Sequence, residues 1–312
     1  MLNRLIPDPF LVALTIVVAL AALLPASGSV AEAVDMVATF AIGLLFFLQG
    51  ARLARETVIG GITHWRLHLL VLACTFVLFP LIGLGLHAFM PNLLSENLWV
   101  GVLFLCALPS TVQSSIAFTS IGKGNVPAAI CSATASNLIG IFLTPLLMGL
   151  LLSAKGDAGA DLSAIGKIVV QLLLPFIAGQ ILRPKIGAFV LKHKKILSIT
   201  DRSSILLVVY SAFSAAVVNG IWQRIAVNDL VTLLVLDSVL LAFVLVFTTL
   251  VARAFGFDKP DEVTIVFCGS KKTLASGVPM ANVLFPGAAA GIVILPLMIF
   301  HQIQLMVCAW IC

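Results

Sequence analysis

The sequence predicts an all-α membrane protein with several spans. Hydrophobic residues make up 61% of the 312 residues, charged residues make up 10%, and the mean hydropathy is +1.18. A soluble domain carries about 25% charged residues, so this composition excludes that class. The apolar residues also fall into repeated windows of roughly 20 residues, the length that crosses a bilayer as a helix. The net charge of +5 therefore indicates no nucleic-acid partner, and only its distribution along the topology is informative.

We expect ten transmembrane helices. Polar and turn residues separate the apolar windows, for example at Pro91-Asn92 and Gln223-Arg224. Residues 184–200 mix basic and apolar side chains, which predicts a short amphipathic helix on the membrane surface. The six cysteines lie in apolar segments without CxxC spacing, which favours packing over disulfides or metal binding. The predicted spans lie near residues 9–26, 33–51, 66–89, 97–121, 125–152, 163–183, 202–222, 229–254, 262–286 and 288–311.

The basic residues predict the orientation. With a cytoplasmic amino terminus, the outside segments hold only three of them, namely Lys155, Lys167 and Arg224. Cytoplasmic loops carry the excess of lysine and arginine, so both termini are predicted to be cytoplasmic, in a bacterial inner membrane. The thirteen basic residues on the inside are Arg4, Arg52, Arg55, Arg66, Lys123, Arg183, Lys185, Lys192, Lys194, Lys195, Arg202, Arg253 and Lys259.

The two halves of the chain, 1–152 and 153–312, resemble each other weakly. The first span begins Pro9-Phe10-Leu11-Val12-Ala13, and the sixth carries Pro175-Phe176-Ile177-Ala178-Gly179. Small polar residues fall in the fourth and ninth spans, at corresponding positions of the halves. Five spans in each half invert the second half relative to the first. Inverted repeats with discontinuous helices are typical of secondary transporters whose binding site lies near the midplane.

Two adjacent lysines, Lys271 and Lys272, lie within the apolar ninth span. Charges at this depth are costly and commonly mark an ion or solute pathway. The run Ser270-Lys271-Lys272-Thr273-Leu274-Ala275-Ser276-Gly277 supplies the small residues that an unwound, cavity-lining backbone needs. The alternative is that both lysines extend from a helix end to the membrane interface. We take Lys271, Lys272, Ser270, Thr273 and Ser276 as candidate binding residues.

Polar side chains in three other spans complete the candidate site. In the fourth span, Gln113, Ser114 and Ser115 follow Pro109, which removes a backbone donor. In the fifth span, Ser132 and Asn137 are polar, although small hydroxyl residues also serve close helix packing. The candidate residues from these spans and from the eighth, whose carboxylate could neutralise a lysine, are Gln113, Ser114, Ser115, Ser132, Asn137 and Asp237.

The string Pro109-Ser110-Thr111-Val112-Gln113-Ser114-Ser115, with Lys123-Gly124-Asn125 after it, resembles the bile acid:sodium symporter family. The run from Phe267 to Pro279 is similar to the YfeH-like branch of SBF-like transporters. The resemblance covers nearly the whole chain. It implies a core domain of spans three to five and eight to ten, and a panel domain of spans one, two, six and seven. It also implies that spans four and nine are broken and cross within the core. Ile311-Cys312 lacks a basic cytoplasmic tail, which favours a longer natural chain.

The sodium ligands of that family are only partly present. Its Ser-Asn pair falls on Ser114 and Ser115, and its glutamate falls on Ser270, so these are vestigial sodium positions. A hard cation needs several oxygen ligands, and two ammonium groups would repel it. We therefore expect a lysine to replace the bound cation. The family's hydroxyl ligands of span five and its Gln-Asn pair of span nine fall on residues without a side-chain oxygen, namely Ala129, Ala133, Leu274 and Ala275. A glutamine of its third span falls on Thr75.

The sequence thus predicts a secondary active transporter for a small, anionic organic solute in the lipid bilayer. It needs no cofactor, and coupling to H+ or to Na+ stays open. A proton-coupled cation antiporter and a non-transporting regulatory membrane protein are the alternatives. An intramembrane enzyme is disfavoured because the chain has no HExxH and no GxSxG motif.

Overall fold

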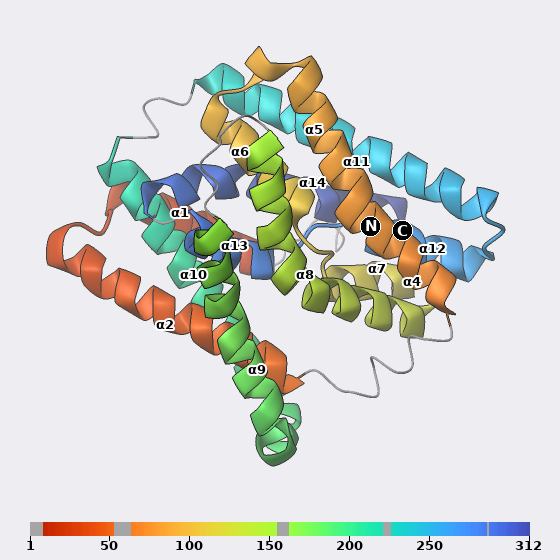
Figure 1. Cartoon of the computed structure of the whole chain (residues 1–312), viewed down its shortest axis with the longest axis horizontal. Coiled ribbons are helices and arrows are strands. Elements are labelled where there is room, and N and C mark those ends of the chain that lie inside the picture. The colour runs from red at the N-terminus through yellow and green to blue at the C-terminus, as the bar shows by residue number, and fades with distance from the viewer. Residues whose placement is uncertain (1–8, 53–63, 155–161, 221–225, 286) are drawn as a thin grey trace. The chain divides into compact units, whose positions relative to one another are not determined.

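A computed structural model describes residues 9–52, 64–154, 162–220, 226–285 and 287–312. Within these ranges every regular element is a helix, and no strand occurs (Figure 1). Several loop residues that carry the predicted orientation, such as Arg4, Arg55, Lys155 and Arg224, lie outside the described ranges. The all-helical class predicted from composition is confirmed.

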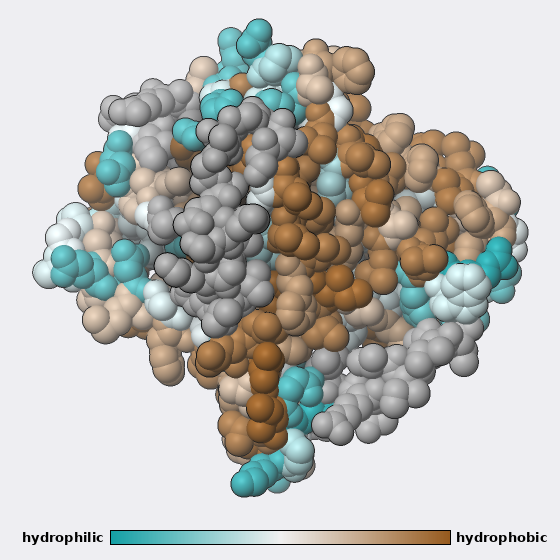
Figure 2. Space-filling model, viewed as in Figure 1, coloured by the Kyte–Doolittle hydropathy of each residue, from teal (hydrophilic) through white to brown (hydrophobic). Residues whose placement is uncertain are grey.

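Among the described residues, seven helices are long and apolar enough to cross a membrane. Two shorter apolar helices, Val12–Leu23 and Glu96–Ala107, add to these. Large apolar side chains face outward along them, as Figure 2 shows over α5 and α8, where Leu81 is 61% exposed and Leu146 is 47% exposed. Apolar surface of this extent requires lipid as its solvent, so the chain is an integral membrane protein. The seven helices are Gly28–Arg52, Trp65–Phe89, Val126–Leu152, Leu172–Val190, Lys195–Val218, Val227–Ala254 and Ala288–Ile311.

The chain forms two compact units, of which the first contains residues 1–53, 161–226 and 278–294. Its complete helices are α1 (Pro9–Leu23), α2 (Gly28–Arg52), α9 (Leu162–Lys192) and α10 (Lys194–Val218). Residues 278–284 and 288–294, which are parts of the last two helices of the chain, also belong to it. α2 packs against both α9 and α10, and α10 also packs against α1.

Two glycines set the closeness of α2 and α9. A Cβ atom at Gly50 would lie 2.1 Å from the carbonyl oxygen of Phe176, and one at Gly179 would lie 2.0 Å from that of Phe47. Small residues allow helix backbones in a membrane to approach to this extent. An ion pair between Arg52 and Asp201 ties α2 to α10 as well.

The predicted surface helix over residues 184–200 is not a separate element. α9 continues through Pro184 to Lys192, and α10 begins at Lys194, so only His193 interrupts the helices. The same spacing of basic and apolar residues suits the exposed face of these longer helices, where Phe189 and Ile196 are each 61% exposed.

The second unit contains residues 54–160, 227–277 and 295–312, and it includes both lysines. Residues 274–277 of α13 (Leu274–Leu284) and 295–311 of α14 (Ala288–Ile311) also belong to it. The remaining elements are α4 (Trp65–Ala73), the π-helical turn η3 (Cys74–Leu78), α5 (Phe79–Phe89), the 3-10 turn η4 (Pro91–Leu93), α6 (Glu96–Ala107), α7 (Gln113–Ile121), α8 (Val126–Ala154), α11 (Val227–Ala254) and α12 (Lys259–Gly269).

Two non-helical segments lie inside this unit. Residues 108–112 separate α6 from α7, and residues 270–273 separate α12 from α13. They touch each other, because the Thr273 amide donates to the Pro109 carbonyl oxygen at 3.0 Å. Helix ends expose unpaired N–H and C=O groups, so the meeting of two such segments creates a polar centre within an apolar unit.

Candidate functional site

The ammonium group of Lys272 is held by three backbone carbonyl oxygens. Lys272 is 0% exposed. Its Nζ donates to Thr75 at 2.8 Å, to Cys106 at 2.8 Å and to Leu108 at 2.7 Å. Nζ also lies 4.0 Å from the centre of the Phe79 ring, a cation–π contact. An ammonium has three donors, and all three are used here.

The Thr75 carbonyl oxygen is free to accept from Lys272 because of the π-helical turn η3. Within it the Phe79 amide donates to the carbonyl oxygen of Cys74, five residues earlier. The next bond of that pattern would join Thr75 to residue 80, but Pro80 has no N–H. The Thr75 carbonyl therefore remains available to Lys272.

The carbonyl oxygens of Cys106 and Leu108 are free because α6 ends at Ala107. The amide that would continue the helix from Cys106 belongs to Ser110, and it donates instead to the Ser136 hydroxyl at 3.0 Å. Leu108 lies in the non-helical segment just before Pro109. These carbonyls give Lys272 the negative end of a helix, which favours a cation.

Gln304 of α14 holds the backbone of Lys272. Its Oε1 accepts from the Lys272 amide at 3.0 Å, and its Nε2 donates to the Lys272 carbonyl at 2.9 Å. Nε2 also lies 2.7 Å from Nδ1 of His301. Gln304 is 0% exposed, so this pairing satisfies two backbone groups that no helix bond reaches.

Hydroxyl groups of the 108–115 stretch satisfy the end of α12. Ser110 donates to the carbonyl oxygen of Cys268 at 2.6 Å, and Ser115 donates to that of Phe267 at 2.9 Å. Thr111 is within 2.6 Å of the Ser114 hydroxyl and 2.9 Å of the Ser115 hydroxyl. These side chains therefore join the two interrupted helices.

Asn137 of α8 links the first non-helical segment to the first turn of α13. Its Nδ2 donates to the Ser110 carbonyl at 2.6 Å, while its Oδ1 accepts from the Ser276 hydroxyl at 3.2 Å. Ser270 donates to the Val266 carbonyl within its own helix at 2.6 Å. Thr273 is buried and contributes its backbone to the contact between the segments.

Lys271 has very different surroundings. Its side chain is also 0% exposed, yet its Nζ has no hydrogen-bond partner in the described part of the chain. Nζ lies 4.4 Å from the centre of the Phe118 ring and 5.5 Å from that of Phe267. The thiols of Cys268, Cys308 and Cys312 are its other neighbours.

Three further candidates have other surroundings among the described residues. Gln113 is exposed, and Ser132 is bonded to His68 Nδ1 at 2.6 Å. Asp237 is buried, and both of its carboxylate oxygens lack a hydrogen-bond partner among the described residues. No ion pair joins it to either lysine within those residues, so its expected role in neutralising them finds no geometric support.

The sequence reasoning missed the carbonyl acceptors and the role of Gln304. Backbone carbonyls have no sequence signature of their own. The signal that could have found one of them is Phe79-Pro80, because a proline in a span frees the carbonyl four or five residues earlier.

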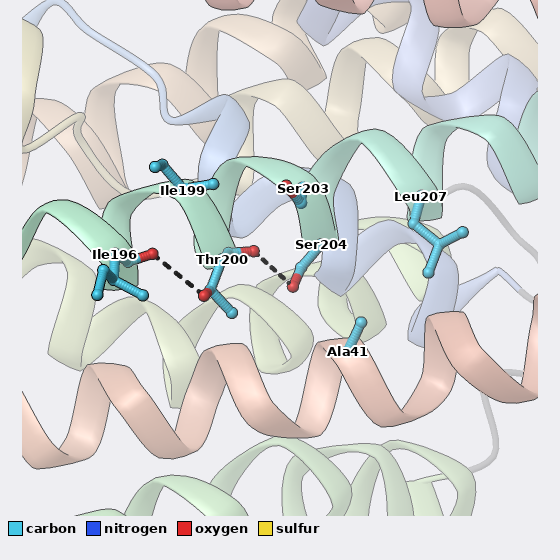
Figure 3. Close-up of a pocket in the computed structure, with 7 residues that line it drawn as sticks. All are labelled: Ala41, Ile196, Ile199, Thr200, Ser203, Ser204 and Leu207. Carbon is cyan, nitrogen blue, oxygen red and sulfur yellow. Dashed lines mark hydrogen bonds between the residues drawn. The ribbon is translucent and has the colours of Figure 1, made fainter.

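A shallow groove in the first unit is separate from this network of contacts. It has a volume of about 360 Å³ and lies between α2 and α10 (Figure 3). Thr200 donates to the Ile196 carbonyl at 3.2 Å, and Ser204 donates to the Thr200 carbonyl at 2.9 Å. Because these hydroxyls are satisfied by their own helix, the groove offers less to a polar ligand than the lysine centre does.

A helical membrane chain with buried lysines at interrupted helices is of the class that includes channels and secondary transporters. Comparison with known proteins narrows this class. The model of the SBF-like CPA transporter family matches residues 8–312. The chain therefore belongs to the SBF-like CPA transporter family, and the resemblance seen in its sequence is confirmed.

Named relatives agree with this assignment. An uncharacterized protein of Pseudomonas aeruginosa is 60% identical over 98% of this chain and 92% of its own length. YfeH of Escherichia coli (strain K12), a candidate symporter by name, is 55% identical over 97% of this chain and 91% of its own length. Sodium/bile acid cotransporter 7 of Rattus norvegicus is 27% identical over 98% of this chain and 92% of its own length. The chain is thus a transporter of the bile acid:sodium symporter type and not an enzyme.

Proposed function

We propose that the chain is a secondary active transporter in which Lys272 permanently replaces a bound cation. The observation that carries this proposal is the set of three carbonyl oxygens at 2.7–2.8 Å from its Nζ. A metal cation would draw on the same kind of oxygen atoms, freed by the same helix interruptions. A tethered ammonium satisfies them without any ion from solution.

The vestigial sodium positions support this proposal. The Ser115 hydroxyl is bonded to Phe267, and the Ser270 hydroxyl is bonded to Val266. Neither position supplies a carboxylate, and Ala129 and Ala133 have no side-chain oxygen. A hard cation binds best with several oxygen ligands, preferably including a carboxylate. We therefore infer that sodium does not drive transport through these positions.

The transport cycle is proposed to alternate access by moving one domain against the other. The two compact units support this idea, because helices α1, α2, α9 and α10 group apart from the elements that carry the lysines. We assign the first group to the panel domain and the second to the core domain. We further propose two inverted repeats of five spans, 1–152 and 153–312, in a bacterial inner membrane with both termini cytoplasmic.

The solute is proposed to be a small organic anion. α7 and α13 both begin in the polar centre, at Gln113 and Leu274. The first N–H groups of a helix lack partners within it, and the positive end of the helix dipole favours negative charge. Two lysines in the same centre add to this preference.

A proton-coupled cation antiporter is the second candidate function. The observation that favours it is the Lys271 ammonium, which has no hydrogen-bond acceptor in the described residues. Loss of its proton would remove the charge that repels a cation. Such a protein would exchange a cation for protons and would not accumulate an organic anion.

An uptake screen in proteoliposomes tests these functions. The full chain would be reconstituted and supplied with labelled organic anions under a sodium gradient, a proton gradient or neither. We expect uptake of an anion that does not depend on sodium. Saturable sodium-driven uptake would contradict the tethered-cation proposal. Dissipation of a proton gradient by added cations, without anion uptake, would establish the antiporter instead.

A further inference from the structure

Asp237 places a carboxyl group in the interior of a membrane-spanning helix. It lies ten residues after Val227, the first residue of α11. At about 1.5 Å per residue it is therefore roughly 15 Å along the helix, near the middle of a hydrocarbon core of about 30 Å. Asp237 is 0% exposed, and neither carboxyl oxygen has a hydrogen-bond partner among the described residues. Ionisable groups at this depth are rare and usually functional.

The neighbours of Asp237 on α11 supply nothing that would stabilise a negative charge. One helical turn away on either side lie the buried residues Leu233, Leu240 and Leu241. An ionised carboxylate in apolar surroundings is so costly that the group takes up a proton instead. A metal cation would need several oxygen ligands, which these leucines do not offer. A proton needs only the carboxylate itself.

The ionisable groups of the neighbouring elements have other partners. α12 packs against α11, and its Glu262 pairs with Arg253 and Lys259. The Cys106 thiol of α6 neighbours Asp237 as well as Lys272, whose ammonium donates to three carbonyl oxygens. In the described part of the chain no hydrogen bond or ion pair joins Asp237 to any of these groups. The other ionisable side chains of α12 are Lys259, Asp261 and Cys268.

A permanently neutral carboxyl group would be of little use to the fold. Without a hydrogen bond in the described chain, it contributes less to stability than an apolar side chain of the same size would. Its value therefore lies in a state in which it meets water and can ionise. Such a state is available to a protein that opens its buried helix faces in turn to the two sides of a membrane.

We infer that Asp237 is a proton-binding site in the middle of the membrane. In the arrangement described here it is a neutral carboxylic acid. When the buried face of α11 opens to water, the carboxyl O–H bond breaks and the proton passes to a water molecule; the same bond forms again when water on the other side returns a proton. The inference deepens the proposed function, because it names the proton as the coupling ion, and it rests on that function for the role of the proton in transport.

The test is labelling of the full chain in proteoliposomes with dicyclohexylcarbodiimide, an apolar reagent. The O–H of a protonated carboxyl group adds across a C=N bond of the reagent, the proton moves to nitrogen, and rearrangement gives a stable N-acylurea that peptide mass spectrometry locates. We expect Asp237 to be labelled, with a decrease of roughly tenfold or more between about pH 6 and about pH 10, because only the protonated form reacts.

Two other carboxyl groups serve as controls for the labelling. Glu262 is also buried but is held by two basic side chains, so it should remain unlabelled by the apolar reagent. A hydrophilic carbodiimide should label the exposed Glu96 and should leave Asp237 unlabelled.

A variant gives a second, independent measurement. Asp237→Asn keeps the size of the side chain and is neutral at every pH. In the wild type, unfolding brings the carboxyl group into water, where it releases its proton, so a higher pH favours unfolding. We expect the two proteins to melt alike at acidic pH and the wild type to melt at progressively lower temperature than the variant as pH rises. Glu262→Gln, which loses two ion pairs, should instead be less stable than the wild type at neutral pH.

Three results would overturn the inference. They are no labelling of Asp237 by the apolar reagent, labelling that does not change with pH, and an Asp237→Asn variant whose melting temperature follows that of the wild type at every pH. Neither measurement uses a gradient, so each separates this site from the transport proposal. Labelling that titrates, together with no uptake of any anion in the proteoliposome screen, would refute the transport function and leave the proton site intact.

Discussion

The side chain of Gln304 pairs with the backbone of Lys272 through two hydrogen bonds. The Lys272 amide donates to Oε1 at 3.0 Å, and Nε2 donates to the Lys272 carbonyl at 2.9 Å. This pairing fixes a residue that has no helical partner, and it determines the direction in which the Lys272 side chain leaves the backbone. Adjacent residues point in different directions, which explains why Lys271 lies against aromatic rings while Lys272 lies against carbonyl oxygens.

The two lysines should respond oppositely to the same substitution. Lys272→Met leaves three buried carbonyl oxygens without a donor, and we expect a loss of about 2–5 kcal/mol in the free energy of unfolding. Lys271→Met removes a buried charge with no hydrogen bond and should be neutral or stabilising. Thermal unfolding in detergent measures both variants. Equal losses of stability in the two variants would show that the three carbonyl oxygens around the Lys272 ammonium do not stabilise the fold.

Sodium should leave the wild-type protein unaffected. A cation that binds the native state would raise its melting temperature, and the Lys272 ammonium already occupies the oxygen atoms that would hold one. We expect the same melting temperature in sodium chloride and in choline chloride. A saturable rise with sodium alone would contradict the tethered-cation proposal.

The same idea predicts chemical rescue. Lys272→Ala removes the ammonium but keeps the carbonyl oxygens of Thr75, Cys106 and Leu108, so a small cation can bind in its place. We expect sodium or methylammonium to restore part of the lost stability of this variant and to have no effect on Lys271→Ala. Without any cation response in Lys272→Ala, the oxygen atoms would not form a cation site.

Much of this centre could be predicted from the sequence, but not its hydrogen bonds. The apolar windows indicate the membrane class, and the lysines stand out because charge is rare there. The non-helical segments 108–112 and 270–273 fall on the stretches rich in small polar residues and, in the first case, on Pro109. The hydrophobic pattern shows where spans lie, because burial in lipid dictates it.

The partners of the lysines depend on tertiary contacts that no local pattern encodes. Thr75 and Lys272 are 197 residues apart, and the contact involves a main-chain oxygen. By charge alone Asp237 is suited to neutralise a lysine, yet its carboxylate forms no ion pair with either of them in the described residues. Charge complementarity in a sequence therefore gives candidates, and helix packing decides among them.

Close packing of α2 and α9 should fail when a methyl group is added at their contact. Gly179→Ala places a Cβ atom 2.0 Å from the Phe47 carbonyl oxygen, so the helices must separate. We expect a loss of about 1–3 kcal/mol in the free energy of unfolding. Gly43→Ala is the matched control on α2, because nothing lies within 4 Å of its added Cβ atom. Similar stability of the two variants would argue against a tight contact.

The pairing of Gln304 with Lys272 gives the last prediction. Gln304→Met keeps the length of the side chain but leaves the Lys272 amide and carbonyl without partners. An unsatisfied buried polar group costs about 1–3 kcal/mol, so we expect a loss of roughly 2–5 kcal/mol in the free energy of unfolding. Gln302→Met is the matched control two residues earlier on α14, and it should change stability by less than about 0.5 kcal/mol.

Gln304→Met should also weaken the hydrogen bonds of the Lys272 ammonium, because the backbone that positions this side chain is no longer held. If the side chain and the backbone act together, the loss in the double variant Gln304→Met, Lys272→Met will be smaller than the sum of the two single losses. Thermal unfolding of the four proteins in this cycle gives the coupling. If the loss in the double variant equals the sum of the two single losses, Gln304 stabilises α14 independently and does not position Lys272.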